Sequence, residues 1–361
     1  MKDRTKTLLK DSFGSLVSND RALAAAKTSP IWLTIIIFFL AVLLPLVPIT
    51  TSYASVSGAS GVNANSYGLK NTVSHFALEM YKDGNTLVVN DENQLDITNT
   101  DVTPIYEYKN SITNLTELRV FVAGYDNKGK TTAEINGKTQ TVKNQEKYVN
   151  DIYENFKEVV SEEGDTKTYS MSSFMVFFKD VYTFFTFKQG TDTAGTSFQG
   201  DYKSFKPGTD LYKLLVESSK TTEITKPASS EEIKTMLANN VEIENTIFNN
   251  YKTFLKVSYR TAKDRSTLYS TLIFGGIYLG LSLLMALIIW LLTRGKNNPF
   301  NYMSLLTTFK IESWISLAPG LIGLLLGLIL PLQMSIKMML FIAPLGFRVM
   351  FLLTKQLRPM Q

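Results

Sequence analysis

One segment of the chain has the spacing of a phosphate-binding loop. Gly124-Tyr-Asp-Asn-Lys-Gly129-Lys130-Thr131 fits the pattern G-x-x-x-x-G-K-[ST], in which backbone amides and the lysine hold nucleotide phosphates. A true site needs a helix that begins at the Lys-Ser/Thr pair. Here residues 131–135 lead directly into Asn136-Gly137, a strong hairpin-turn signal, so no helix fits. We therefore predict a hairpin turn with residues 127–129 as the reversal, and no role for Lys130 in function.

The cysteine and histidine counts exclude several other kinds of chemistry. The chain of 361 residues has no cysteine and a single histidine, His75. Thiol nucleophiles, thiolate zinc sites and multi-histidine metal sites are therefore excluded, and a Ser-His-Asp triad could use only His75. No partner motif accompanies His75, and we interpret it as an ordinary surface or packed residue. Because no pair of carboxylates is singled out by its spacing either, we expect a protein without catalytic, cofactor-binding or metal-binding residues.

Two charged residues stand out because their surroundings are apolar. Arg348 lies inside the apolar stretch 338–354, and Glu312 directly precedes the apolar stretch 313–332. Charged side chains within a bilayer are costly and mark candidate functional sites by default. Two interpretations of Arg348 remain open. Its side chain either extends to the cytoplasmic face of the membrane, or it forms an ion pair with Glu312.

These residues belong to a set of long apolar stretches. A helix needs about 18 or more apolar residues to cross the ~30 Å hydrocarbon core of a bilayer. The candidates are residues 31–50, 268–293, 313–332 and 338–354. We therefore predict four transmembrane helices. Gly276-xxx-Gly280 in the second and Gly323-xxx-Gly327 in the third match the small-xxx-small pattern of close helix packing.

The distribution of positive charge predicts the orientation. Lysine and arginine are frequent in the leader and in the loop 294–312 and occur again in the tail, whereas the turn between the last two spans has only Lys337. Loops rich in these residues stay in the cytoplasm, so both termini are predicted inside and the large insert 51–267 outside. The insert carries 24 basic and 28 acidic residues. The basic pI of about 9.0 therefore reflects topology and not nucleic-acid binding.

The absence of cysteine from an external domain indicates a bacterial cell membrane. A signal peptide cleaved near residues 52–54 is the alternative to an uncleaved first span. The long leader and the long apolar run favour the uncleaved anchor. The apolar residues of the leader recur at helical spacing, which favours an amphipathic helix on the membrane surface over an unstructured segment.

The predicted organisation alternates between the two sides of the membrane. Its parts are a cytoplasmic amphipathic leader at 1–29, transmembrane helix 1 at 30–50, a linker at 51–71, an extracytoplasmic α+β domain at 72–267, transmembrane helix 2 at 268–293, a cytoplasmic loop at 294–312, transmembrane helix 3 at 313–332, transmembrane helix 4 at 338–354 and a cytoplasmic tail at 355–361.

The external domain has mixed local patterns. Strands are predicted at 86–89, 106–108, 118–123, 131–135 and 139–143 and a helix at 147–161, while residues 171–187 fit neither period and 189–228 are predicted irregular. Ser229 or Ser230 caps a long helix that runs toward the second span. That helix is either continuous with the span or broken near residues 263–266.

The C-terminal part carries a family resemblance. Residues 299–306 read Pro-Phe-Asn-Tyr-Met-Ser-Leu-Leu, and residues 312–320 read Glu-Ser-Trp-Ile-Ser-Leu-Ala-Pro-Gly before a Leu/Gly-rich span. This resembles the bacterial membrane-protein family named maltodextrose utilization protein MalA, loosely also in the leader and first span. The resemblance implies a non-enzymatic accessory component of a carbohydrate (malto-oligosaccharide) ABC transport system, with the lipid bilayer and other transporter subunits as partners and no cofactor.

The order of spans resembles a second group, the FtsX/MacB-like permeases. They share one span, a large external domain and three further spans, which implies a separate cytoplasmic ATPase as partner. Residues 293–300 lack the motif expected after the second span of that group.

Overall fold

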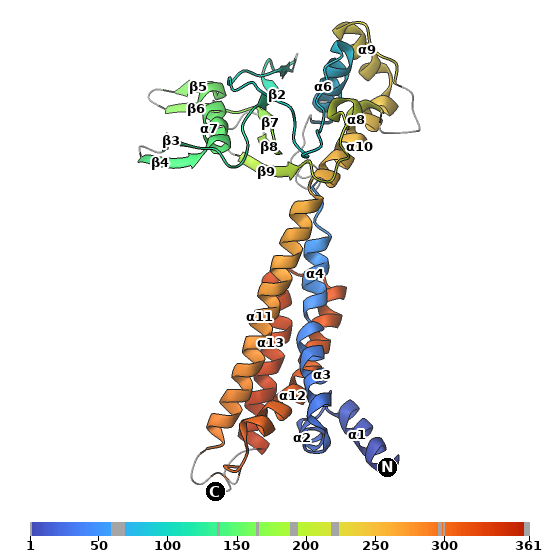
Figure 1. Ribbon diagram of the computed structural model, residues 1–361, viewed down its shortest axis with the longest axis vertical. Coiled ribbons are helices and arrows are strands. Elements are labelled where there is room, and N and C mark those ends of the chain that lie inside the picture. Colours follow the sequence, from blue (N-terminus) through green and yellow to red (C-terminus); the bar gives the residue numbers. More distant parts are fainter. Residues whose placement is uncertain are drawn as a thin grey trace. The chain divides into compact units, whose positions relative to one another are not determined.

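The computed structural model describes residues 2–58, 69–110, 112–135, 138–163, 166–187, 194–217, 224–294, 298 and 300–356. The chain forms two compact units, a helical unit of residues 1–55 and 264–361 and an α+β unit of residues 56–263 (Figure 1). The predicted turn at Asn136-Gly137, Pro299 and residues 59–68 of the predicted linker lie outside the described residues.

The helical unit holds the apolar stretches. Its elements are α1 (Lys2–Gly14), α2 (Asn19–Thr28), α3 (Ile31–Leu43), α4 (Leu46–Ala54), α11 (Arg260–Leu292, in this unit from Asp264), α12 (Leu305–Ile329), α13 (Met334–Phe351) and a π-helical turn, η1 (Leu352–Gln356). Three helices, α11, α12 and α13 extended to Thr354, are long and apolar enough to cross a membrane, and the bent pair α3–α4 makes a fourth candidate when it is counted as one span.

The bend between α3 and α4 follows from Pro45. The two helices meet at 41°, and Pro45 is the residue directly before α4. Proline lacks the N–H of the helical hydrogen-bond ladder, and its ring collides with the preceding turn. Pro45 therefore accounts for the kink between the two helices.

A stripe of glycines on α12 lets α3–α4 approach closely. A Cβ atom added to Gly320 would lie 2.6 Å from the Ala41 oxygen, and one added to Gly323 would lie 2.8 Å from Pro45 Cβ. One added to Gly327 would lie 2.7 Å from Pro48 Cγ. Residue numbers rise together along the two partners, so α12 runs in the same direction as α3–α4. The first and third spans of a chain that crosses a membrane back and forth also run in the same direction.

The glycines of α11 behave differently. Gly276 and Gly280 are exposed, and no described atom lies within 4 Å of a Cβ added to either residue. The predicted close packing of these two residues is therefore wrong for contacts within the chain. The buried stripe of α11 consists of Tyr278, Ser282, Ala286 and Ile289. Gly276 and Gly280 lie two positions from Tyr278 and so point to the opposite side of the helix.

The leader forms two helices that pack on the bundle. The turn between them is closed by the ion pair of Arg21 Nη1 and Asp11 Oδ1, 2.7 Å apart. Helix α2 buries Ala22, Ala25 and Ala26 in the same apolar cluster as Trp314 of α12. The leader is therefore helical in two pieces, and a part of its surface is buried by protein. Its location on the membrane surface stays a prediction.

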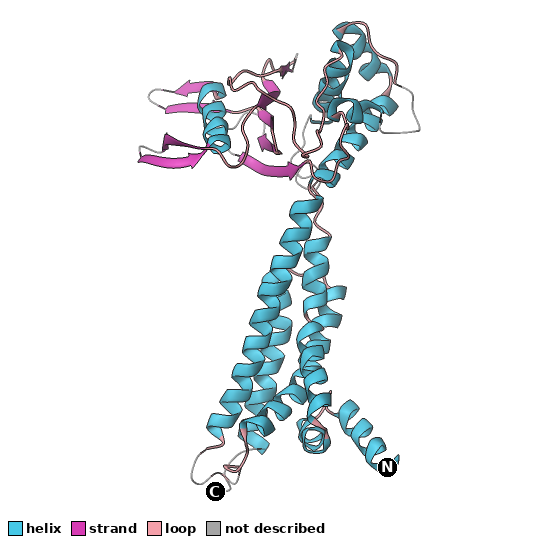
Figure 2. Ribbon diagram, viewed as in Figure 1, coloured by secondary structure: helices cyan, strands magenta, loops and turns pink. Residues whose placement is uncertain are grey.

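The α+β unit is built on a five-stranded sheet. The sheet contains β1 (Tyr106–Lys109), β2 (Thr116–Ala123), β7 (Ser173–Phe178), β8 (Val181–Phe187) and β9 (Ala194–Asp201) in the order β1-β2-β7-β8-β9. Strands β2 and β7 pair in parallel, and the other neighbours pair antiparallel. Two separate hairpins, β3 (Lys130–Ile135) with β4 (Lys138–Lys143) and β5 (Glu158–Glu163) with β6 (Thr166–Ser170), belong to the β2–β7 crossover (Figure 2).

Helices cover both faces of this sheet. Helices α6 (Leu69–Asp83), α8 (Leu211–Glu217) and α10 (Val241–Ser258) bury one face together with Met175 and Phe177. Helix α7 (Asn144–Phe156) buries the other face over Phe174, Val176 and Phe178. Strand β7 is therefore buried on both sides, which explains why its residues show no alternation in the sequence.

Several sequence-based boundaries are corrected by these elements. The helix predicted at 147–161 ends at Phe156, and a strand follows. Residues 86–89 form only isolated bridges, Val88 with Asp210 and Val89 with Leu95. Strand β9 and helix α8 lie in the region predicted to be irregular, and α6 begins within the predicted linker.

The long helix predicted toward the second span consists of three pieces. Helix α9 (Ser230–Asn239) ends before Asn240, and α10 ends before Tyr259. The Asn240 side chain caps α10, since its Oδ1 accepts hydrogen bonds from the backbone amides of Glu242 and Ile243 at 3.1 and 3.3 Å. The chain then continues in α11 from Arg260, with no break near residues 263–266.

Candidate functional site

Arg348 of α13 connects three parts of the helical unit. Its Nε donates to Asn19 Oδ1 at 2.8 Å, and its Nη2 donates to the Ser15 oxygen at 2.7 Å. Its Nη1 donates to the Ile315 oxygen of α12 at 3.0 Å. Asn19 Nδ2 in turn donates to the Arg348 backbone oxygen at 3.0 Å. The guanidinium thus ties α13 both to α12 and to the turn of the leader.

Pro319 explains why the Ile315 oxygen is available to Arg348. In a regular helix that oxygen would accept from the N–H four residues later, but residue 319 is a proline inside α12. An unpaired buried carbonyl is costly, and the guanidinium has several fixed donors that can satisfy it. Arg348 of α13 therefore supplies the hydrogen bond to the Ile315 oxygen that Pro319 cannot form within α12.

The structure contradicts one of the two interpretations of Arg348. Among the described residues it forms no ion pair with Glu312, and its three nitrogen atoms all donate to uncharged oxygens. The predicted pairing is wrong, because the freed carbonyl and the Asn19 amide occupy the guanidinium. The other interpretation is compatible with these contacts, since Asn19 and Ser15 belong to the leader that the charge pattern assigns to the cytoplasm.

Glu312 of α12 is completely buried and has no counter-ion within the described part of the chain. Its exposed fraction is 0 %, and neither carboxyl oxygen forms a hydrogen bond with a described residue. The Ser282 side chain of α11 is the polar group that reaches toward it, although not in good hydrogen-bond geometry. The Ser282 and Tyr278 hydroxyls are buried and likewise lack partners among the described residues.

The neighbouring polar residues of α12 are already occupied. Lys310 Nζ donates to the Ser29 backbone oxygen at 2.7 Å, where α2 ends. Trp314 Nε1 donates to Ser29 Oγ at 3.1 Å. These bonds hold the start of α12 against the junction of α2 and α3, and they leave Lys310 turned away from the Glu312 carboxyl.

In the α+β unit, His75 is a packed residue, as interpreted from the sequence. It lies on α6 with its ring centroid 5.1 Å from that of Tyr108, and neither ring nitrogen forms a hydrogen bond with any residue that the structure describes. Burial lowers the pKa of His75 from its ordinary value, against the smaller opposing effect of Glu79. The described residues contain no group of three or more potential metal-ligating side chains.

The phosphate-loop pattern does not form a phosphate site. Lys130 is exposed and begins strand β3, where a nucleotide site would need a helix. Asp126 Oδ1 accepts from the amides of Lys128 and Gly129, both at 3.0 Å, and so orders the turn. The turn joins β2 to β3, which belong to different sheets. The predicted hairpin reversal at residues 127–129 is therefore wrong, although the rejection of the phosphate site stands.

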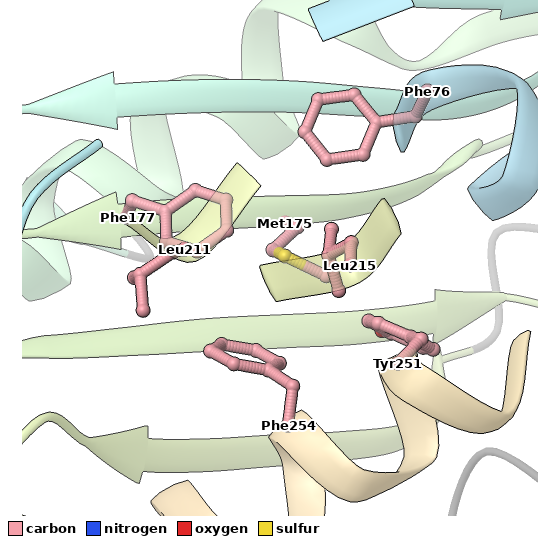
Figure 3. Close-up of a pocket in the computed structure, with 7 residues that line it drawn as sticks. All are labelled: Phe76, Met175, Phe177, Leu211, Leu215, Tyr251 and Phe254. Atoms are coloured by element: carbon pink, nitrogen blue, oxygen red, sulfur yellow. The ribbon is translucent and has the colours of Figure 1, made fainter. Parts of the chain in front are cut away.

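The cavities of the α+β unit differ in kind. A void of about 10 Å³ lies in the core between the sheet and the helices, and its lining is made of Phe76, Met175, Phe177, Leu211, Leu215, Tyr251 and Phe254. The apolar side chains point into this void (Figure 3), which is about the size of one water molecule. It therefore holds no larger ligand.

A larger groove lies where α7 leaves the edge of the sheet uncovered. Its volume is about 370 Å³, and Phe185, Thr183 and Gln199 line it from β8 and β9. Gln145 and Asn150 line it from the side of α7. A second groove of about 260 Å³ lies near Thr131 and the ion pair of Lys147 and Asp151.

Sequence reasoning missed several of the residues that shape these sites. Asn19 and Ser15 gave no signal, because a polar residue in a cytoplasmic leader is ordinary. Tyr278 and Ser282 did give a sequence signal, since polar residues four positions apart inside an apolar stretch share a helix face. Comparisons with protein-family models, with curated proteins and with solved structures find no match for this chain.

Proposed function

We propose that this chain is a non-enzymatic multi-pass protein of a bacterial plasma membrane whose α+β unit lies outside the cell. In this proposal it serves as an accessory, partner-binding component of a carbohydrate (malto-oligosaccharide) ABC transport system. The apolar helices support the membrane assignment, and the charge pattern supports the orientation.

The groove beside α7 is the observation that carries the carbohydrate assignment. It combines the aromatic rings of Phe178, Phe185 and Phe198 with amide and hydroxyl side chains such as Gln145, Asn150, Thr183 and Gln199. Small-molecule sites typically pair apolar or aromatic surface with a few polar groups that fix the orientation of the ligand. A sugar, with an apolar ring face and a rim of hydroxyls, is complementary to such a lining.

Two measurements test this proposal. Affinity purification of the full chain in mild detergent, with mass spectrometry, should recover sugar-transporter permease and binding-protein subunits. Calorimetric titration with malto-oligosaccharides should show binding that Gln199→Ala weakens. Asn249→Ala is the matched control, because Asn249 is exposed on α10 and does not line the groove. A partnerless protein that binds no oligosaccharide would contradict the proposal.

The second candidate is an FtsX/MacB-like ABC permease subunit that couples a cytoplasmic ATPase to the external domain. The contact of the leader with α12 and α13 through Arg348 favours it, since movement of the leader would be transmitted to both helices. Recovery of a cytoplasmic ATPase at fixed stoichiometry, with loss of coupling in Asn19→Ala, would select this function over the first.

A further inference from the structure

The contact of α11 with the rest of the helical unit is narrow and unexpectedly polar. The helix buries Tyr278, Ser282, Ala286 and Ile289, which follow one another at helical spacing. Its other large apolar side chains are mostly exposed, as expected for a helix that faces lipid. Two of the four contact residues nevertheless carry hydroxyl groups, and both hydroxyls lack a described partner.

Glu312 of α12 lies beside Ser282 of this stripe, whereas Tyr278 packs on Phe341 of α13. An ionised carboxylate that is removed from water without a partner is strongly disfavoured in a medium of low dielectric, and such groups become neutral instead. Glu312 is 0 % exposed, and both its oxygens are without partners among the described residues. A proton would remove the charge and would give the carboxyl an O–H that can donate to Ser282 Oγ.

The charged groups around this contact do not supply a counter-ion. Helix α3 contains no ionisable residue, and on α11 the buried ionisable residue is Tyr278. On α12, Lys310 is bound to the Ser29 oxygen, and on α13 the nitrogen atoms of Arg348 are bound to neutral oxygens. The remaining ionisable group on α13 is Lys337, which donates to Ser52 Oγ. On α2, Arg21 is paired with Asp11, and the other ionisable residues are Asp20 and Lys27.

We propose that Glu312 is a proton-binding site inside the membrane and that its proton holds α11 against α12. With the proton bound, the contact contains only neutral groups. When the O–H bond breaks and the proton leaves to water, a carboxylate remains that must be hydrated, so α11 separates from α12 locally. This inference does not depend on the transporter assignment.

The reactivity of Glu312 toward dicyclohexylcarbodiimide tests the bound proton. A protonated carboxyl adds across one C=N bond of this apolar reagent, its proton passing to nitrogen, and the resulting O-acylisourea rearranges to a stable N-acylurea. We expect peptide mapping of the full chain in lipid nanodiscs to find this adduct on Glu312 at neutral pH. The yield should fall as the pH rises, and Glu312→Gln should have no adduct at this position.

Infrared spectroscopy makes the result independent of reagent access. The difference spectrum of the wild type minus Glu312→Gln should contain the C=O band of a protonated carboxyl at neutral pH. If the spectrum instead contains the bands of a carboxylate, the proposal is overturned, whatever the labelling yield. Glu312→Gln keeps the shape of the side chain and its neutrality, so it should fold like the protonated wild type.

A second experiment tests the effect on α11. Since the chain has no cysteine, Ala286→Cys places a single thiol in the buried stripe. At alkaline pH we expect a thiol reagent to label it at least several-fold faster in the otherwise wild-type chain than in the Glu312→Gln chain. Both rates are measured at the same cysteine position and the same pH, so the two proteins differ only at residue 312. Equal rates in the two proteins would refute the coupling to α11.

Discussion

Arg348 of α13 donates a hydrogen bond to the backbone oxygen of Ile315 in α12, and Pro319 of α12 makes this bond possible. Nη1 of Arg348 lies 3.0 Å from the Ile315 oxygen, which Pro319 leaves without its helical donor. The irregularity of α12 and the charge on α13 are therefore two parts of one contact. The remaining nitrogens of Arg348 carry this contact on to the leader.

Asn19→Ala should loosen the leader. The substitution removes two hydrogen bonds with Arg348, one from the guanidinium and one to its backbone oxygen. Hydrogen bonds to charged groups contribute about 1.5–3 kcal/mol, so we expect a loss of that order in the free energy that holds α2 on the bundle. Limited proteolysis should cut the leader faster in Asn19→Ala, whereas Val17→Ala, at an exposed position, should leave the rate unchanged.

Arg348→Leu and Glu312→Leu should be additive in their effects on stability. The two side chains form no ion pair, and each has its own surroundings. Thermal unfolding of the two single variants and the double variant in detergent should give an interaction free energy within about 0.5 kcal/mol of zero. A coupling well above that value would restore the ion pair that the structure contradicts.

Gly320→Ala should destabilise the helical unit, and Gly276→Ala should not. A Cβ at residue 320 would lie 2.6 Å from the Ala41 backbone oxygen, while nothing described lies within 4 Å at residue 276. Overpacking a tight contact costs about 1–3 kcal/mol, and an exposed change costs less than about 0.5 kcal/mol. Thermal unfolding in nanodiscs compares the two. If Gly276→Ala is the more damaging variant, the close approach of α12 and α3 does not limit stability.

Acidification should weaken the packing of α6 through His75. Burial lowers the pKa of His75 below its ordinary value of 6.5, so the unfolded chain binds a proton more readily than the folded chain does. The free energy of unfolding is therefore highest above a pH of about 6.5. It falls as the pH drops below that value, by up to about 1.4 kcal/mol per pH unit.

Hydrogen exchange of α6 peptides in the full chain can measure this loss. His75→Phe removes the titrating group and preserves a ring beside Tyr108, and it provides the reference at each pH. The wild type should exchange faster than His75→Phe below the ordinary pKa and at a similar rate above it. The same difference at all values of pH would show that His75 does not titrate in this way.

Lys130→Ala should leave both folding and function intact. The side chain is exposed at the start of β3 and lines neither groove described above. The purified protein should also show no rise in melting temperature with ATP, in either the wild type or the variant. Loss of function in a folded Lys130→Ala protein would revive the phosphate-loop interpretation.

Part of this architecture was predictable, because apolar length and proline placement are local signals. The apolar stretches and the kink at Pro45 belong to this class, as do β1 and β2. The ends of elements depended on tertiary contacts instead. Residues 158–161 looked like the end of a helix, but they pair with β6 and form a strand. Strand β7 hid its type because helices cover both of its faces.

The candidate site was predictable only in its charged members. Arg348 and Glu312 stood out against an apolar background, but their partners were set by a distant proline and by the turn of the leader. The sequence showed Arg348 and Glu312 as opposite charges and so suggested an ion pair. It could not show that the Ile315 oxygen competes for the guanidinium, since that requires α12 and α13 to be placed side by side.

The order of the sheet has a consequence for how the α+β unit acquires its structure. Leu118 of β2 pairs with Ser173 of β7, so the central parallel pair joins strands that are separated in sequence by two hairpins and α7. One face of the sheet is covered both by α6, near the start of this unit in the sequence, and by α10, near its end. Such non-local pairing is slow and leaves apolar strands exposed meanwhile. If the unit is exported as proposed, its folding must wait for nearly all of its residues to cross the membrane, and a chain truncated before α10 should aggregate.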